Sequence, residues 1–164
     1  MSQTMPDWSS TIIPDCMMEV LSTEAISKAR EFYIRSHPGK EQECEGWNDL
    51  TFLNKIGLTI NGKVTYAAMV LLGNPDYSHR VPGAALRIRW ILRDIDRSTI
   101  DNDFFDVPCI LAGDTLCGKI RNVKYDYFRP GTLVPDRMET YDPMMLREAL
   151  YNCIAHQDYT MGEY

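Results

Sequence analysis

Residues 141–159 read YDPMMLREALYNCIAHQDY and carry the clearest helical pattern of the chain. Asp142 can cap a helix, and Pro143 suits the first helical position because proline has no N–H to leave unpaired there. Apolar or small residues then recur on one side, at Leu146, Ala149, Leu150, Cys153 and Ile154. This spacing predicts a helix over 143–157 with one buried side.

A second stripe on the same helix is polar. Glu148, Asn152 and His156 stand four residues apart, so they share a side of the helix. A carboxylate can orient a water molecule and a carboxamide can coordinate a hard cation such as magnesium, as an ATP phosphate site requires. The same spacing is also typical of a solvated helix surface, so the residues alone leave both interpretations open.

Earlier in the chain, further segments combine helical spacing with residues that favour helix starts. Side chains that can cap them are Ser22, Asn48 or Asp49, and Thr65. The predicted helices cover 23–37, 48–56, 66–72 and 108–124. Residues 40–46 are polar and predict a loop, and Asn61-Gly62 predicts a turn. Short helices around a small hairpin are typical of a winged-helix-like arrangement in the first half.

The period changes to two between residues 84 and 93. There Leu86, Ile88, Trp90 and Leu92 alternate with Arg87, Arg89, Ile91 and Arg93. This predicts a half-buried strand. Two short extended pieces at 125–134, around the turn signal Pro130-Gly131, would complete a small mixed sheet. The fold class expected from these elements is α+β, a small mixed sheet with several packed helices.

The arginines of this strand have two interpretations. Arg87, Arg89 and Arg93 could contact DNA or RNA, together with Lys63 and a later helix that carries Lys119, Arg121 and Lys124. Acidic neighbours such as Asp106 could instead pair with the arginines, which would make the face an ordinary solvated surface.

The composition excludes several classes of protein. Of 164 residues, 45% are hydrophobic and 24% charged, which excludes a mostly disordered chain. No stretch reaches the roughly 18 apolar residues of a membrane helix, so no membrane partner is expected. Because 17 basic against 23 acidic residues give a net charge of −6, the chain as a whole lacks the basic surface that neutralises phosphates.

The cysteines and histidines point to no catalytic or zinc site. Five widely spaced cysteines favour buried, reduced thiols in the cytoplasm: Cys16, Cys44, Cys109, Cys117 and Cys153. No C-x-x-C pair or nearby histidine gives zinc-ligand spacing. No P-loop or G-x-S-x-G motif is present either.

Residues 147–159, REALYNCIAHQDY, are similar to a signature of bacterial ATP-binding regulators described as RecG-helicase-related or divergent AAA proteins. Residues 52–59 (FLNKIGLT) and 61–73 (NGKVTYAAMVLLG) resemble a second block of that family. Residues 119–122 (KIRN) and 131–133 (GTL) resemble further landmarks. The resemblance covers roughly residues 20–164.

The resemblance implies a domain organisation. In that family a Schlafen-like, Alba-type domain thought to bind nucleic acid comes first, and an ATPase-like domain resembling the GHKL fold of gyrase comes last. The chain would then be the region between them: an extended lead-in (1–20), a linker and interaction domain (21–138) and the truncated start of the ATPase-like domain (139–164). Residues 161–164 would begin a strand.

By the same resemblance, Glu148 activates water and Asn152 binds magnesium–ATP in the full-length protein. The glycine-rich segments that would complete such a site do not follow Asn152. The fragment alone is therefore expected to be no enzyme and to hold no cofactor.

Two functions follow as expectations. The first is an interaction region of an ATP-binding transcriptional regulator. Such a region would contact its own flanking domains or a second copy, and would reach DNA or RNA through the missing N-terminal domain. The second is a direct DNA- or RNA-binding module that uses Arg87, Arg89 and Arg93. The two differ in salt dependence, because binding to phosphates weakens steeply as salt rises.

Overall fold

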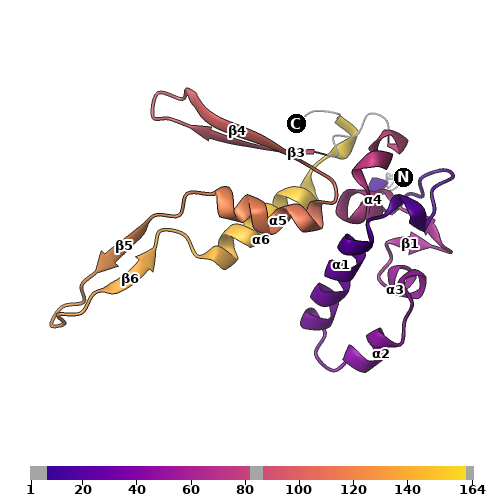
Figure 1. Ribbon diagram of the computed structural model, residues 1–164, viewed down its shortest axis with the longest axis horizontal. Coiled ribbons are helices and arrows are strands. Elements are labelled where there is room, and N and C mark those ends of the chain that lie inside the picture. Colours follow the sequence, from indigo (N-terminus) through magenta and orange to yellow (C-terminus); the bar gives the residue numbers. More distant parts are fainter. Residues whose placement is uncertain (1–6, 82–86, 162–164) are drawn as a thin grey trace, which may run out of the picture. The chain divides into compact units, whose positions relative to one another are not determined.

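The computed structural model describes residues 7–81 and 87–161, and its helices and small antiparallel hairpins confirm the α+β class (Figure 1). The helices are α1 (Thr23–Ser36), α2 (Glu41–Glu45), α3 (Asp49–Lys55), α4 (Tyr66–Leu72), α5 (Cys109–Lys119) and α6 (Pro143–His156). The strands are β1 (Thr59–Ile60), β2 (Lys63–Val64), β3 (Arg87–Arg93), β4 (Thr99–Asp106), β5 (Lys124–Tyr127) and β6 (Asp136–Glu139). Short 3-10 helices are η1 (Trp8–Ser10), η2 (Met18–Val20), η3 (Pro75–Arg80) and η4 (Tyr159–Met161).

Contacts divide the chain into two compact units. The first unit holds the described parts of residues 1–112 and 158–164, and the second holds residues 113–157. The domain boundaries predicted after residues 20 and 138 stay a prediction.

Local capping sets most helix starts of the first unit, as predicted. The side chains of Ser22, Asn48 and Thr65 accept hydrogen bonds from backbone N–H groups in the first turns of α1, α3 and α4. Between α3 and α4, Asn61 and Gly62 have φ values of 51° and 80°. Because both central residues have positive φ, the turn that joins β1 to β2 follows the type I′ pattern.

The lead-in before α1 contributes residues to the core of the first unit and contains the short helices η1 and η2. Ile13 and Cys16 are buried, and the backbone N–H of Ile13 donates to the carbonyl of Val64 at 2.9 Å. The apolar residues of the lead-in follow no helix or strand period, so their burial could not be predicted from the sequence. They join a core whose largest fully buried side chains include Phe52, Leu53 and Met69.

The predicted small mixed sheet is wrong in detail. The described strands form separate antiparallel hairpins: β1 with β2, β3 with β4, and β5 with β6. The predicted strand 84–93 is seen as β3, and its first residues, 84–86, lie outside the described residues. Its partner β4 was not predicted, because its acidic residues resemble a solvated loop. The winged-helix-like arrangement stays a prediction, since the described hairpin after α3 has strands of only two residues each.

Two helix predictions also need correction. α5 ends at Lys119 instead of residue 124, and residues 124–127 form β5. The polar segment 40–46, predicted as a loop, contains the short helix α2. Its Cys44 is buried, and that one apolar anchor is too little to give a periodic pattern.

Candidate functional site

Helix α6 presents the stripe that the sequence singled out. Asp142 accepts a hydrogen bond from the backbone N–H of Met144 at 2.7 Å, and Pro143 opens the helix as predicted. Leu146 and Leu150 are half-buried and Ile154 is buried, so one line at four-residue spacing faces inward. Two residues predicted on this apolar side are instead exposed: Ala149 and Cys153. The buried stripe is therefore narrower than predicted.

Glu148, Asn152 and His156 all lie on the exposed part of α6. Among the described residues, these three side chains have no hydrogen-bond or ion-pair partner. The carboxylate oxygens of Glu148 and the amide oxygen of Asn152 therefore remain available to a ligand.

The oxygens of Glu148 and Asn152 are too few to hold a magnesium ion by themselves. Asn152 offers one neutral oxygen, whereas magnesium takes octahedral coordination and usually keeps water and phosphate ligands. Within residues 7–81 and 87–161, no cluster of three or more His, Cys, Asp or Glu side chains could hold a metal ion. Any cation bound through Asn152 would need further ligands from the nucleotide, from water or from another segment.

The inward side of α6 is fixed against α5 in the second unit, where the two helices lie side by side (Figure 1). Arg147 forms an ion pair with Asp114 at 2.8 Å. A Cβ atom on Gly113 would lie 2.7 Å from the Tyr151 hydroxyl, so the small glycine permits this close approach. Burial also raises the pKa of Tyr151. These contacts set the rotation of α6 and keep its Glu148 side toward solvent.

The end of the 147–159 segment has structural roles in the first unit. Asp158 accepts hydrogen bonds from both the backbone N–H and the hydroxyl of Thr160, at 2.9 and 2.5 Å. Tyr159 stacks on Trp8 with ring centroids 5.3 Å apart, and Trp8 stacks in turn on Tyr66 at 4.5 Å. Burial raises the pKa of Tyr159. The sequence could not reveal this stack, because its rings come from three distant segments.

The arginines of β3 share a face with an aromatic ring. Arg87 and Arg89 each place the guanidinium carbon 5.5 Å from the centre of the Phe104 ring, and Phe104 is 43% exposed. Arg87 also pairs with Asp106, as the solvated-surface interpretation predicted. Arg93 is exposed, beyond a register shift at the end of the strand.

The other basic candidates are scattered. Lys63 is exposed on β2, and Lys119 is the last residue of α5. Arg121 lies between α5 and β5, and Lys124 lies in β5, so these two do not belong to the helix on which they were predicted. Lys124 pairs with Glu139 at 3.0 Å. These basic side chains therefore lie on several different elements.

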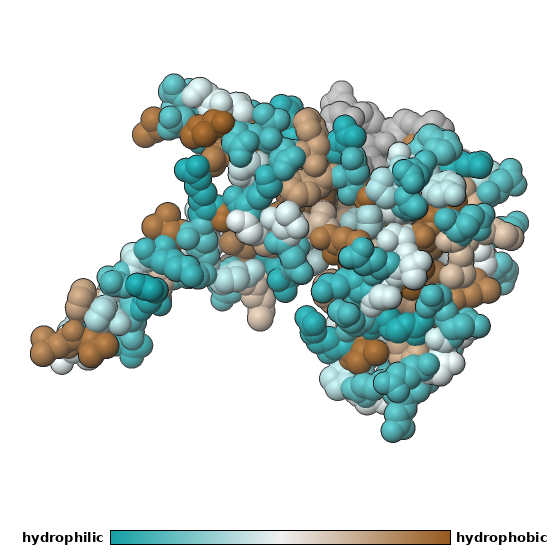
Figure 2. All heavy atoms as spheres, in the orientation of Figure 1, coloured by the Kyte–Doolittle hydropathy of each residue, from teal (hydrophilic) through white to brown (hydrophobic). Residues whose placement is uncertain are grey.

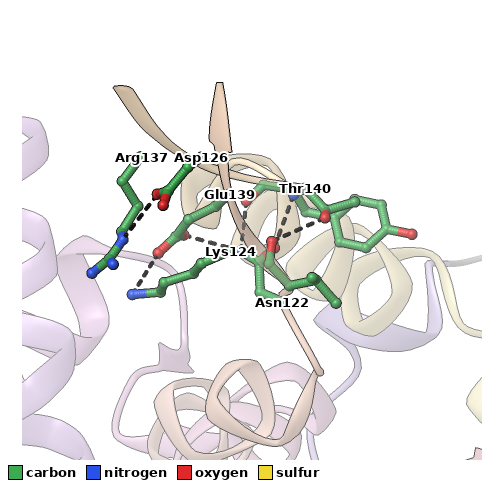
Figure 3. A network of polar contacts seen from close by, with 8 residues as sticks. Asn122, Lys124, Asp126, Arg137, Glu139 and Thr140 are labelled. Atoms are coloured by element: carbon green, nitrogen blue, oxygen red, sulfur yellow. Dashed lines mark hydrogen bonds and ion pairs between the residues drawn. The ribbon is translucent and has the colours of Figure 1, made fainter. Parts of the chain in front are cut away.

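A polar network ties the β5–β6 hairpin to the start of α6 (Figure 3). Asn122 donates from Nδ2 to Glu139 at 3.0 Å and to the carbonyl of Tyr141 at 2.7 Å. Its Oδ1 accepts from the N–H of Tyr141 at 2.9 Å. Asn122 belongs to the 119–122 landmark, and its geometry assigns it a structural role.

The described helices and antiparallel hairpins give the chain an α+β fold. Residues 1–86 match the family described as a domain of unknown function (DUF8451), and the chain belongs to that family. No curated protein matches the chain.

A similar solved structure is that of the DIP2311 protein from Corynebacterium diphtheriae. The identity is 17% and the TM-score 0.67, over 96% of this chain and 30% of that chain. This likeness shows the fold alone, and the chain spans about a third of the length of that protein. No helix among the described residues has the length and apolar character to cross a membrane.

Proposed function

We propose that this chain is the interaction region of a longer, ATP-binding transcriptional regulator, and that α6 supplies one edge of its nucleotide site. The observation that carries the proposal is the state of Glu148 and Asn152. Both lie on the solvent side of a helix whose opposite side is packed, and neither is engaged by another described residue. The resemblance of residues 147–159 to the RecG-helicase-related signature supports magnesium–ATP binding by Asn152 and water activation by Glu148.

In this proposal each residue has a distinct task. Asn152 contributes a ligand oxygen to magnesium, which neutralises phosphate charge when the nucleotide is bound. Glu148, one turn earlier, orients the attacking water and accepts its proton. The Arg147–Asp114 pair and the Tyr151–Gly113 contact hold both side chains outward. We place the protein in the cytoplasm, in keeping with its five free cysteines.

The test uses the full-length protein with Asn152→Ala, Glu148→Ala and, as a control on the exposed first turn of α6, Met144→Ala. Asn152→Ala should weaken magnesium–ATP binding by about 10- to 100-fold, since a ligand to the ion is lost. Glu148→Ala should leave binding in place and slow hydrolysis by about 100-fold or more. Wild-type binding and hydrolysis in both variants would contradict the proposal, as would a gene that encodes only these 164 residues.

A second candidate function rests on the β3–β4 hairpin. Two guanidinium groups beside the half-exposed ring of Phe104 resemble the mixture of cations and aromatic rings that binds single-stranded nucleic acid. Arg89→Ala should then weaken oligonucleotide binding, and the affinity should fall steeply between low and physiological salt. No salt-dependent binding to the 164-residue chain would remove this candidate.

A further inference from the structure

The β5–β6 hairpin has two unlike faces. Lys124 stands opposite Glu139 and Asp126 opposite Arg137, with ion pairs at 3.0 and 3.6 Å. Because side chains alternate along a strand, these four charges share one face. The other face carries Tyr125, Tyr127, Met138 and Asp136, and Asp136 pairs with Arg129 at 2.6 Å.

The aromatic face is open. Tyr125 is 48%, Tyr127 47% and Met138 44% exposed. Beyond the strands, Phe128, Leu133 and Val134 are more exposed still, and Figure 2 shows hydrophobic side chains gathered at the far end of the hairpin. A two-stranded hairpin is marginal in water by itself, so additional strands would stabilise it.

The outer edge of β5 can be deduced from one backbone hydrogen bond. The N–H of Thr140 donates to the carbonyl of Val123 at 2.9 Å, in register with the β5–β6 pairing. Bonded and non-bonded pairs alternate along an antiparallel ladder, so the backbone groups of Tyr125 and Tyr127 face β6. Those of Lys124 and Asp126 face outward. Among the described residues, no third strand pairs with this edge.

The charges of Lys124 and Asp126 favour one register if the outer edge of β5 pairs with the same edge of a second copy. An antiparallel copy of β5 must bring outward-facing backbone groups opposite each other, which leaves three registers. Two of them place Lys124 opposite Lys124, or Asp126 opposite Asp126, and like charges opposite each other destabilise a sheet. The third places Lys124 opposite Asp126 of the second copy. Symmetry makes that favourable pair occur twice, on either side of Tyr125.

We propose that β5 pairs with β5 of a second copy of this chain, antiparallel about Tyr125, to form a four-stranded sheet. The sheet keeps a charged face and an aromatic face, and Lys124 bridges Glu139 of its own chain and Asp126 of the second copy. Arg137 and Glu139 give β6 the same charge pattern, but all four β5 residues are exposed whereas Asp136 and Glu139 of β6 are half-buried. This inference is independent of the proposed nucleotide site.

The first test measures the mass of the chain by sedimentation at high micromolar concentration, where the wild type should be a dimer. Lys124→Asp/Glu139→Lys preserves the ion pair within the hairpin but places aspartate opposite Asp126 of the second copy, so this variant should be monomeric. Adding Asp126→Lys/Arg137→Asp restores every pair and should restore the dimer. A monomeric wild type, or a dimer that the first variant leaves intact, would overturn the proposal.

A crosslink distinguishes the two edges. The two Tyr125 residues would form a non-hydrogen-bonded pair, with Cα atoms about 4.5 Å apart, within the range of a disulfide. In a Cys153→Ser background, Tyr125→Cys should therefore form an intermolecular disulfide, whereas Met138→Cys should not. Crosslinking through position 138 instead of 125 would show that the β6 edge pairs and would overturn the proposed β5 interface.

Discussion

At the scale of single residues, Arg30 links three helices of the first unit. No pattern in the sequence indicates these contacts. Its guanidinium donates to the carbonyl of Cys44 and to Asp49, both at 2.8 Å, and lies 4.5 Å from the centre of the Phe52 ring. It thereby links α1 to α2 and α3. The capping residues could be predicted because their partners lie within three residues, whereas the partners of Arg30 are 14 and more residues away.

Replacing Arg30 should therefore destabilise the fold. We expect Arg30→Ala to lower the free energy of unfolding by about 2 kcal/mol, because a half-buried carbonyl and a carboxylate lose their donor. Urea denaturation followed by circular dichroism would measure the change. The matched control is Arg35→Ala on the exposed side of α1, which should change stability by less than about 0.5 kcal/mol. Equal effects of the two substitutions would refute the role of Arg30.

Gly73 offers a second test at this scale, because it closes α4 in a crowded position. A Cβ atom there would clash with the Met69 carbonyl oxygen, and the neighbouring backbone is held by a hydrogen bond from the N–H of Asn74 to the carbonyl of Val20. Gly73→Ala should lower the free energy of unfolding by about 2 kcal/mol, because the added methyl group overpacks the site and forces the backbone to shift.

The control for this substitution is Gly118→Ala, since nothing lies within 4 Å of a Cβ atom there and the site is helical. Alanine at that position should stabilise the protein by about 0.5–1 kcal/mol. Thermal denaturation of both variants gives the comparison, and a Gly73→Ala protein as stable as the wild type would contradict the packing described.

At the scale of elements, the sequence predicted best where a periodic pattern and a cap coincide. α1 and α6 have both, and their observed bounds differ from the predicted ones by one residue. α5 ends before the apolar spacing of Ile120 and Val123 does, because Asn122 bonds to the backbone of Tyr141 and residues 124–127 pair with β6. β4 was missed because its partner β3, rather than its own acidic sequence, makes it a strand.

The reactivity of the cysteines tests how the helices that carry them are packed. Cys16, Cys44 and Cys109 are buried, and burial raises the pKa of Cys109 to about 12. Cys153 on α6 is exposed, contrary to the prediction that all five thiols are buried. Because the reactive species is the thiolate, alkylation of the native protein at pH 8 should modify Cys153 first, and the three buried thiols only after unfolding.

Peptide mass spectrometry would assign each modified position. A Cys153→Ser protein should lose the fastest phase. If Cys109 or Cys44 reacted as fast as Cys153, the packing around α2 and the start of α5 would be wrong.

At the scale of the whole molecule, the sequence predicted the α+β class and most of the helices but not the contacts between distant segments. The stripe of Glu148 and Asn152 could be found because one helix carries it. The stack of Trp8, Tyr66 and Tyr159 could not, since contacts between distant segments leave no period in a sequence. The family match of residues 1–86 falls within the first unit, whereas the proposed nucleotide edge lies in the second.

We propose that α6 is one edge of a nucleotide site that a longer chain completes. Calorimetric titration of magnesium–ATP into the 164-residue chain and into the full-length protein tests it most directly. Magnesium–ATP should bind to the full-length protein only, and Asn152→Ala should weaken that binding. Tight binding to the 164-residue chain, or no binding to the full-length protein, would contradict the proposal.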